Sequence, residues 1–411
     1  MRTSACSRPI CRTASSQRAV TVPTIADELL RPEEPIQAAW AGDPCGGCGT
    51  VGCETVGCGK GCSVTSNHWA RLEYALWWRE GRDLPPLVTT STDGTVQSQA
   101  GVLGLDSTSV LFGGRTVGEN ARPGGRVSIG TWLDPWMRHA VEGRFFILSE
   151  EAVAFEAQST GTPILARPFL NVAGANPIQG SRLLAFDGVS TNGSVQIRSE
   201  SNVLGGDFLY RRRFSQLGST RVDFLAGYQF ARIDENLTIS DFTEAVDIPP
   251  LEQGTTMAIE DSFETRNEFH GGLIGLGTEF GGASWRLELL AKIAFGNMRE
   301  VVKISGQTTV VTPDPNSATS VTPVGLLAQG NNVGRYARNT FAVSPELNVN
   351  FVYSLSECIE LTMGYSYIYW SDAVQPGNQI DDLLAVPPST FVFDNTDFAL
   401  HGLNAGLEFR F

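Results

Sequence analysis

Residues 284–296 read SWRLELLAKIAFG, and this stretch decides the class of fold. Every second residue from Trp285 to Phe295 is apolar, whereas Arg286, Glu288 and Lys292 lie between them. Because successive side chains of a β-strand point to opposite faces, such a strand has one apolar and one charged face. The pattern therefore predicts a strand whose two faces meet different surroundings.

Nine further segments share this two-residue period, and in the clearer ones the apolar face carries no charge. They are residues 69–78, 125–133, 140–148, 201–211, 220–233, 267–280, 340–353, 358–370 and 398–411. Several are longer than the five or six residues usual for a soluble sheet. The chain from residue 68 to 411 is therefore predicted to be one all-β domain of about ten strands.

The connections between these strands alternate between short and long. Those after even-numbered strands are short, at residues 134–138, 212–219, 281–283 and 354–357. Those after odd-numbered strands are long, at residues 79–124, 149–200, 234–266, 297–339 and 371–397. Short periplasmic turns and long outer loops are typical of outer-membrane barrels. The sequence thus predicts an antiparallel transmembrane β-barrel of about ten strands with long outer loops.

Two further features favour a membrane barrel. Aromatic residues lie at strand ends, where an interfacial girdle is expected: Trp69, Trp77, Trp78, Tyr353 and Trp370. The last strand ends LEFRF at Phe411, and we interpret this terminal aromatic residue as the signal read by the barrel-assembly machinery. No run of about 20 apolar residues is available for a membrane helix, so residence in a membrane requires a closed barrel.

Composition excludes two other classes of protein. The 411 residues include 44 acidic and 30 basic ones, with a formal net charge of −14. An acidic excess along the whole chain argues against nucleic acid as a partner, since nucleic acid requires a concentrated basic face. With 42% hydrophobic and 18% charged residues, the chain is also unlike a disordered protein.

Residues 1–67 form an irregular N-terminal segment that differs from the rest. The first residues are rich in arginine, as in a signal peptide, but no apolar stretch follows; this favours a start codon that has been placed wrongly. A Gly-rich cluster then holds Cys45, Cys48, Cys53, Cys58 and Cys62. We favour disulfides in an oxidising compartment, while a metal site or an incidental linker stays open.

Several segments resemble the putative beta-barrel porin family that is abundant in planctomycete bacteria. They include WARLEYALWW (69–78), GGRVSIGTWLD (124–134), RVDFLAGYQFARIDENL (221–237) and GYSYIYWSDAVQPGNQID (364–381). The resemblance runs from Trp69 to the C-terminus and implies a barrel in the bacterial outer membrane, with outer-membrane lipid as its surroundings. The family's porin label derives from the fold and adds little about transport.

The strand registers also predict which residues line the lumen. The candidates are Arg71, Glu73, Arg126, Glu142, Arg144, Arg221, Asp223, Arg286, Glu288, Lys292, Glu346, Glu360, Glu408 and Arg410. Charges of both signs pair across a lumen, whereas a ring of one sign would favour ion selectivity. We expect a narrow, porin-like channel for passive diffusion of small solutes. The alternative is a non-conducting surface scaffold that acts through its long outer loops.

An enzyme is not expected, and neither is a cofactor. A hydrolase at the outer rim is a weaker alternative, because His270 and His401 fall near the outer strand ends with Asp241, Asp261 and Asp397 in nearby loops. The acidic run from Asp241 to Glu264 is expected to be a solvated outer loop, since it lacks the spacing of a calcium loop.

Overall fold

The computed structural model describes residues 67–171, 178–247, 250–282, 284–315, 317–380, 385–386 and 391–411. They fall in the second of two compact units, which spans Lys60–Phe411. The predicted cysteine cluster at residues 45–62 lies outside them. In the part of the chain covered by these ranges, the helical elements are two short 3₁₀ turns, η1 (Gln97–Gln99) and η2 (Gly377–Gln379). No helix there is long and apolar enough to cross a membrane.

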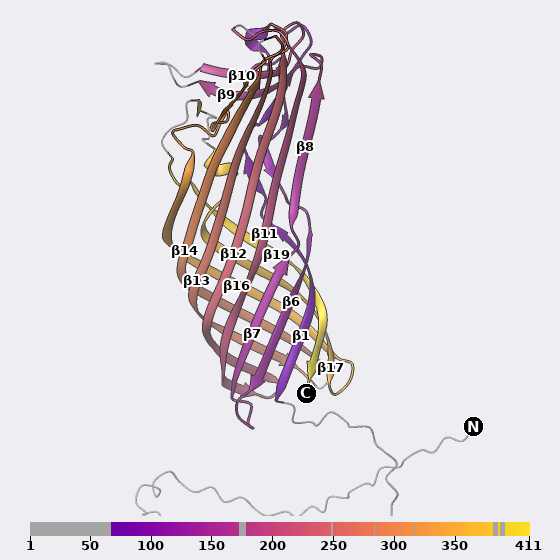
Figure 1. Ribbon diagram of the computed structural model, residues 1–411. Coiled ribbons are helices and arrows are strands. Elements are labelled where there is room, and N and C mark those ends of the chain that lie inside the picture. The colour runs from indigo at the N-terminus through magenta and orange to yellow at the C-terminus, as the bar shows by residue number, and fades with distance from the viewer. Residues whose placement is uncertain are drawn as a thin grey trace, which may run out of the picture. The chain divides into compact units, whose positions relative to one another are not determined.

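Ten antiparallel strands form a closed ring (Figure 1), which confirms the predicted fold class. In chain order they are β1 (His68–Arg79), β6 (Arg122–Trp132), β7 (His139–Leu148), β11 (Ser190–Leu217), β12 (Thr220–Ala245), β13 (Thr256–Gly281), β14 (Trp285–Val311), β16 (Gly334–Ser354), β17 (Ile359–Val374) and β19 (Asn395–Arg410). Each pairs with its neighbours along the chain, and β1 pairs with β19 to close the ring. Closure removes the free edges that a sheet cannot expose to lipid.

The outer wall of the ring is apolar in the half of the barrel that contains the C-terminus. Large apolar side chains are exposed there on all ten strands, for example Leu72, Phe224, Leu289, Phe351 and Leu403. The intervening side chains of the same strands point inward and are charged or polar, as Glu73 and Asp223 illustrate. Apolar-out and polar-in alternation is the arrangement of a barrel embedded in lipid.

Both ends of the barrel domain lie at the same end of the ring. The backbone amide of His68 donates to the carbonyl of Phe411, and the amide of Phe411 donates to the carbonyl of His68, both at 3.1 Å. The connections at this end are short, and the tightest is the two-residue turn at Gly218–Ser219, where Gly218 has a φ of 61°. Short turns identify this end as the periplasmic one.

Four strands continue far beyond the apolar belt. β11, β12, β13 and β14 have 28, 26, 26 and 27 residues, whereas a crossing needs only about 9–11. The structure therefore differs from the sequence prediction at 234–266 and 297–339, because much of these ranges is strand. The run from Asp241 to Glu264 likewise belongs mostly to β12 and β13, joined by a connection at 246–255. We call the part of the barrel beyond the apolar belt the outer extension.

A second sheet lies in the outer extension. It contains β3 (Val88–Ser91), β4 (Thr108–Phe112), β9 (Leu165–Asn171), β10 (Ile178–Ala185) and β18 (Ala385–Val386). The shorter β2 (Arg82–Leu84) pairs with β5 (Arg115–Val117), and β15 (Thr319–Thr322) pairs with the end of β14. β8 (Glu151–Ser159) pairs with β11 above β7. Figure 1 shows β9 and β10 at the end of the barrel opposite the C-terminus.

The second sheet packs against the inner face of the extended strands. The shared core joins Leu87, Val88, Leu165 and Leu184 of the inserted segments to Ile197, Leu237, Ile239, Phe263 and Ile304 of the wall. All of these side chains are at most 5% exposed. The outer extension therefore has an apolar core of its own, like that of a soluble β-protein.

Candidate functional site: the charged interior of the barrel

A cavity of about 570 Å³ occupies the periplasmic end of the barrel. Its rim includes His68 and Trp69 at the start of β1 and Met137 and Glu357 in short turns. Its lining carries seven arginines and seven glutamates. The lining therefore contains equal numbers of arginines and glutamates, not a ring of one sign.

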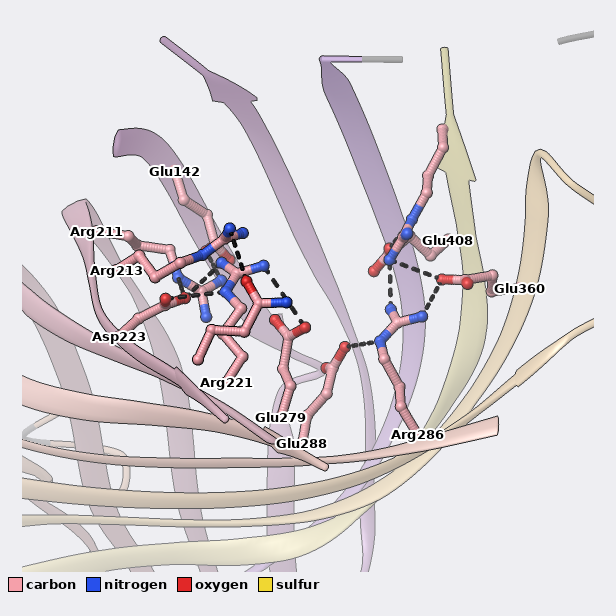
Figure 2. Close-up of polar contacts among 12 residues, drawn as sticks. Glu142, Arg211, Arg213, Arg221, Asp223, Glu279, Arg286, Glu288, Glu360 and Glu408 are labelled. Carbon is pink, nitrogen blue, oxygen red and sulfur yellow. Dashed lines mark hydrogen bonds and ion pairs between the residues drawn. The ribbon is translucent and has the colours of Figure 1, made fainter. Parts of the chain in front are cut away.

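One group of ion pairs crosses the interior from β14 to β1 and β19. Arg286 contacts Glu288 at 2.8 Å, Glu360 at 2.5 Å and Glu408 at 3.2 Å, as Figure 2 shows. Arg71 contacts the same Glu288 at 2.8 Å and the same Glu408 at 2.5 Å. Arg410 completes the group, at 3.1 Å from Glu360 and 3.0 Å from Glu408. Strands on opposite sides of the ring are thus joined through their side chains.

A second group lies on the other side of the cavity (Figure 2). Arg211 contacts Glu142 at 2.9 Å and Asp223 at 3.7 Å. Arg221 contacts Asp223 at 2.5 Å and Glu279 at 3.6 Å. These contacts link β7, β11, β12 and β13.

The floor of the cavity is a tighter, more buried set of charges. Arg144 contacts Asp207 at 2.5 Å and Glu346 at 2.9 Å, and Lys292 contacts both carboxylates, with Glu346 at 2.7 Å. The Lys292 side chain is 0% exposed.

Beside this set, the Arg126 guanidinium donates to both carboxylate oxygens of Glu73, at 2.6 and 3.0 Å. It also donates to Asn348 at 3.1 Å and Ser366 at 2.9 Å. Bidentate pairing of this kind fixes side-chain geometry as well as charge.

Aromatic side chains fill the interior above this floor. We call Trp77, Phe146, Phe269, Trp370 and Phe398 the aromatic layer; none is more than 7% exposed. The ring centroids lie 5.2 Å apart for Trp77 and Phe146, and 5.9 Å for Trp370 and Phe398. Trp77 and Trp370 were expected in the interfacial girdle, but both point inward, since Trp77 follows Arg71, Glu73 and Ala75 on the inner face of β1.

Buried arginines follow directly above the aromatic layer. Arg79, Arg82 and Arg122 are at most 2% exposed and surround Glu151 and Glu235. Arg79 pairs with Glu235, and Arg82 lies 3.2 Å from Glu151 and 3.9 Å from Glu235. Burial lowers the pKa of Arg82, although Glu235 and Glu151 partly oppose this. We call these five residues the arginine layer.

The structure places every predicted lumen-lining residue in the interior. Arg71, Arg126, Arg144, Arg221, Arg286, Lys292 and Arg410 are paired there with Glu73, Asp223, Glu288, Glu346, Glu360 or Glu408. Glu142 is paired with Arg211. The sequence prediction of lumen-lining residues did not include Asp207, Arg211 and Glu279, nor the arginine layer. Continuing the inward alternation of β1 from Glu73 to Arg79 would have found one member of that layer.

In the part of the chain that the structure describes, the hydrogen bonds of His270 and His401 go to tyrosine hydroxyls. The Nδ1 atom of His401 lies 2.9 Å from the hydroxyl of Tyr365, and Nδ1 of His270 lies 2.5 Å from that of Tyr228. Asp241 and Asp261 are instead 4% and 0% exposed, and both contact Arg167 at 2.7 Å. Among the residues placed by the structure, no group of three or more His, Cys, Asp or Glu side chains is arranged to hold a metal ion.

The family described as "Putative beta barrel porin-7" matches residues 69–411. The chain belongs to this family. The description of this family as beta-barrel porins agrees with the closed ring and with its apolar outer wall. The protein is an outer-membrane β-barrel. No curated protein sequence matches the chain.

Solved outer-membrane barrels share only a distant likeness with this porin-family chain. The outer membrane protease OmpT from Escherichia coli is 10% identical, with 86% of this chain and 99% of that chain covered and a TM-score of 0.38. The monoaromatic hydrocarbon channel TodX, in a deltaS2S3 mutant, is 8% identical, with coverages of 84% and 91% and a TM-score of 0.22. The hydrocarbon channel CymD is 7% identical, with coverages of 84% and 89% and a TM-score of 0.17.

Proposed function

We propose that the protein is a sealed barrel that holds a rigid β-structured scaffold on the outer face of the outer membrane. The observation that carries this proposal is the filling of the interior above the cavity. The charged floor, the aromatic layer, the arginine layer and the core of the outer extension follow one another along the barrel axis. Ten strands lie close to the barrel size at which side chains fill the interior.

The length of the strands supports the scaffold. At about 3.3 Å per residue, the 26 residues of β12 extend about 85 Å along the strand. Since a tilted crossing uses only about 9–11 residues, more than half of β12 stands outside the bilayer. An extension with a buried core presents fixed surfaces to partners, whereas a mobile loop must first be ordered.

Buried charge reinforces the outer extension. Arg167 of β9 joins the second sheet to Asp241 of β12 and Asp261 of β13, and all three side chains are at most 1% exposed. Burial lowers the pKa of Arg167, but Asp261 and Asp241 more than compensate and raise it overall. The Asp261 carboxylate also accepts the backbone amides of Leu327 and Ala328, at 3.0 and 2.8 Å. These contacts join the second sheet to β12 and β13, and they join β13 to the segment between β15 and β16.

A narrow diffusion channel is the second candidate. The cavity of about 570 Å³ and the polar floor support it, as does the family's description as porins. Passage of a solute would require the aromatic and arginine layers to move apart.

Planar bilayers distinguish the two candidates. The sealed scaffold predicts a folded, heat-modifiable protein that inserts without stepwise conductance. Reproducible small steps in salt solution would favour the channel. Insertion is verified independently by protease protection of the reconstituted protein, so that silence is not mistaken for failed insertion.

We also propose that the barrel is not an enzyme. The hydroxyl partners of His270 and His401 and the engagement of Asp241 and Asp261 by Arg167 support this. Incubation of the reconstituted protein with peptide and ester libraries tests it. Turnover that disappears in a His270→Ala or His401→Ala variant would refute it.

A further inference from the structure

Charged side chains first appear on the outer wall at one level, on β12, β13 and β14. The last row with aromatic side chains is Phe230, His270, Asn297 and Phe341, which are uncharged cross-strand partners. The next outward row contains Leu204, Arg232, Glu268, Arg299 and Asn339. Since the apolar wall is immersed in lipid, this boundary lies where the headgroups of the outer leaflet begin.

Basic side chains concentrate directly above that boundary. We call Arg232, Arg266, Arg299, Lys303 and Arg335 the outer cationic band. They share the surface with Glu200, Asp234, Glu264 and Glu268, so the band carries a small positive excess in a protein whose net charge is −14. The side chains of Arg266, Arg299 and Lys303 are 47%, 53% and 51% exposed. The band is therefore accessible to molecules around the barrel.

Two cations of the band face each other. Lys303 of β14 and Arg335 of β16 are direct cross-strand partners, an arrangement that destabilises a sheet unless an anion lies nearby. Lys303 contacts Glu264 at 2.8 Å, while Arg335 has no carboxylate within ion-pair distance among the residues placed by the structure. A shallow depression of about 370 Å³ lies beside them, and its lining includes Arg232, Arg266 and Val301 together with the carboxylates of Glu200, Asp234, Glu235 and Glu264.

We propose that the outer cationic band binds the phosphate groups of outer-leaflet lipids, with Lys303 and Arg335 as the principal contacts. A lipid phosphate between these two side chains relieves their repulsion. The acyl chains of the same lipid lie along the apolar wall below, which free phosphate does not offer. The barrel thereby holds a fixed shell of phosphate-bearing lipid around one side.

Native mass spectrometry of the full chain in mixed micelles tests the proposal. The probes are phosphatidylglycerol, whose phosphate is its only charge, and zwitterionic phosphatidylcholine. Wild type should retain phosphatidylglycerol preferentially. Each basic group near an anionic lipid contributes about a factor of five, so Lys303→Gln/Arg335→Gln should weaken retention about 30-fold.

The control removes an exposed arginine of the outer extension that does not line this depression, Arg115→Gln. It should retain phosphatidylglycerol as wild type does. Three results would overturn the proposal: equal retention of both lipids by wild type, equal loss in the control, or inorganic phosphate binding as tightly as the lipid. Unchanged thermal unfolding of Lys303→Gln/Arg335→Gln in detergent verifies that the variant is folded.

Discussion

Replacing Arg167 with Met should loosen the outer extension without affecting the membrane-embedded part. The Arg167 guanidinium donates from Nη1 to Asp241 and from Nη2 to Asp261, both at 2.7 Å. Met fills a similar volume but leaves both buried carboxylates without this cation. Asp241 retains Arg182, at 3.2 Å, and Asp261 retains two backbone amides.

The expected cost follows from these remaining contacts. Removing one partner of a buried ion pair costs about 3–5 kcal/mol. Because each carboxylate keeps part of its hydrogen bonding, we expect the lower end, about 3 kcal/mol. That corresponds to an increase of about 150-fold in the population of the open outer extension.

Amide hydrogen exchange of detergent-solubilised protein measures this change. Exchange within β9 and β10 should accelerate by about the same factor, while β1 and β19 in the apolar belt stay protected. Arg182→Met, which removes a partly exposed partner, should cost less. Neutralising all three charges with Arg167→Met/Asp241→Asn/Asp261→Asn should restore much of the protection, because buried ion pairs contribute little net stability. Unchanged exchange in Arg167→Met would refute the view of the outer extension as a packed unit.

Three further outcomes are expected. Leu289→Arg on the lipid face should cost about 2–4 kcal/mol in denaturant unfolding from vesicles, while Leu289→Met should be nearly neutral, and equal effects would contradict the assigned lipid face. Phe411→Ala, which removes an exposed ring that stacks on His68, should reduce assembly in cells but leave refolding in detergent unchanged; equal yields in cells would exclude the assembly signal. Mass spectrometry of alkylated, unreduced protein should find disulfides within Cys45–Cys62, whereas free thiols with stoichiometric zinc would favour a metal site.

The ten strands were predictable because lipid imposes a simple rule on their outer faces. From Val222 to Phe230, every second residue of β12 is apolar and faces the lipid, and this pattern identifies the strand. Above Phe230 the same period continues with the opposite phase, since Leu237 and Ile239 point inward to the apolar core. The solvent changes there from lipid to water, so the inner face becomes the apolar one. A pattern sought in one phase therefore ends at this boundary although the strand does not.

The charged interior was only partly accessible from sequence. Alternation shows which side chains point inward, but it does not show which charges form ion pairs. Asp241 and Asp261 lie in an acidic run typical of solvated loops, and the arginine that pairs with both, Arg167, is 74 and 94 residues away in the sequence. The filling of the lumen had a visible signal in the aromatic residues at inward positions. Trp77 and Trp370 were assigned instead to the girdle, because strand ends and inward faces both attract tryptophan.

The aromatic layer provides the most direct test of the sealed barrel. Trp77 is 1% exposed and donates through Nε1 to Asn404 at 2.7 Å, whereas its neighbour Trp78 packs on the outer wall beside His401. Single-channel recording should compare wild type, Trp77→Ala/Trp370→Ala and the control Trp78→Ala. We expect no conductance for wild type and for Trp78→Ala, and conductance steps or increased leak only for the double variant. Steps of equal size in all three proteins would contradict the sealed barrel.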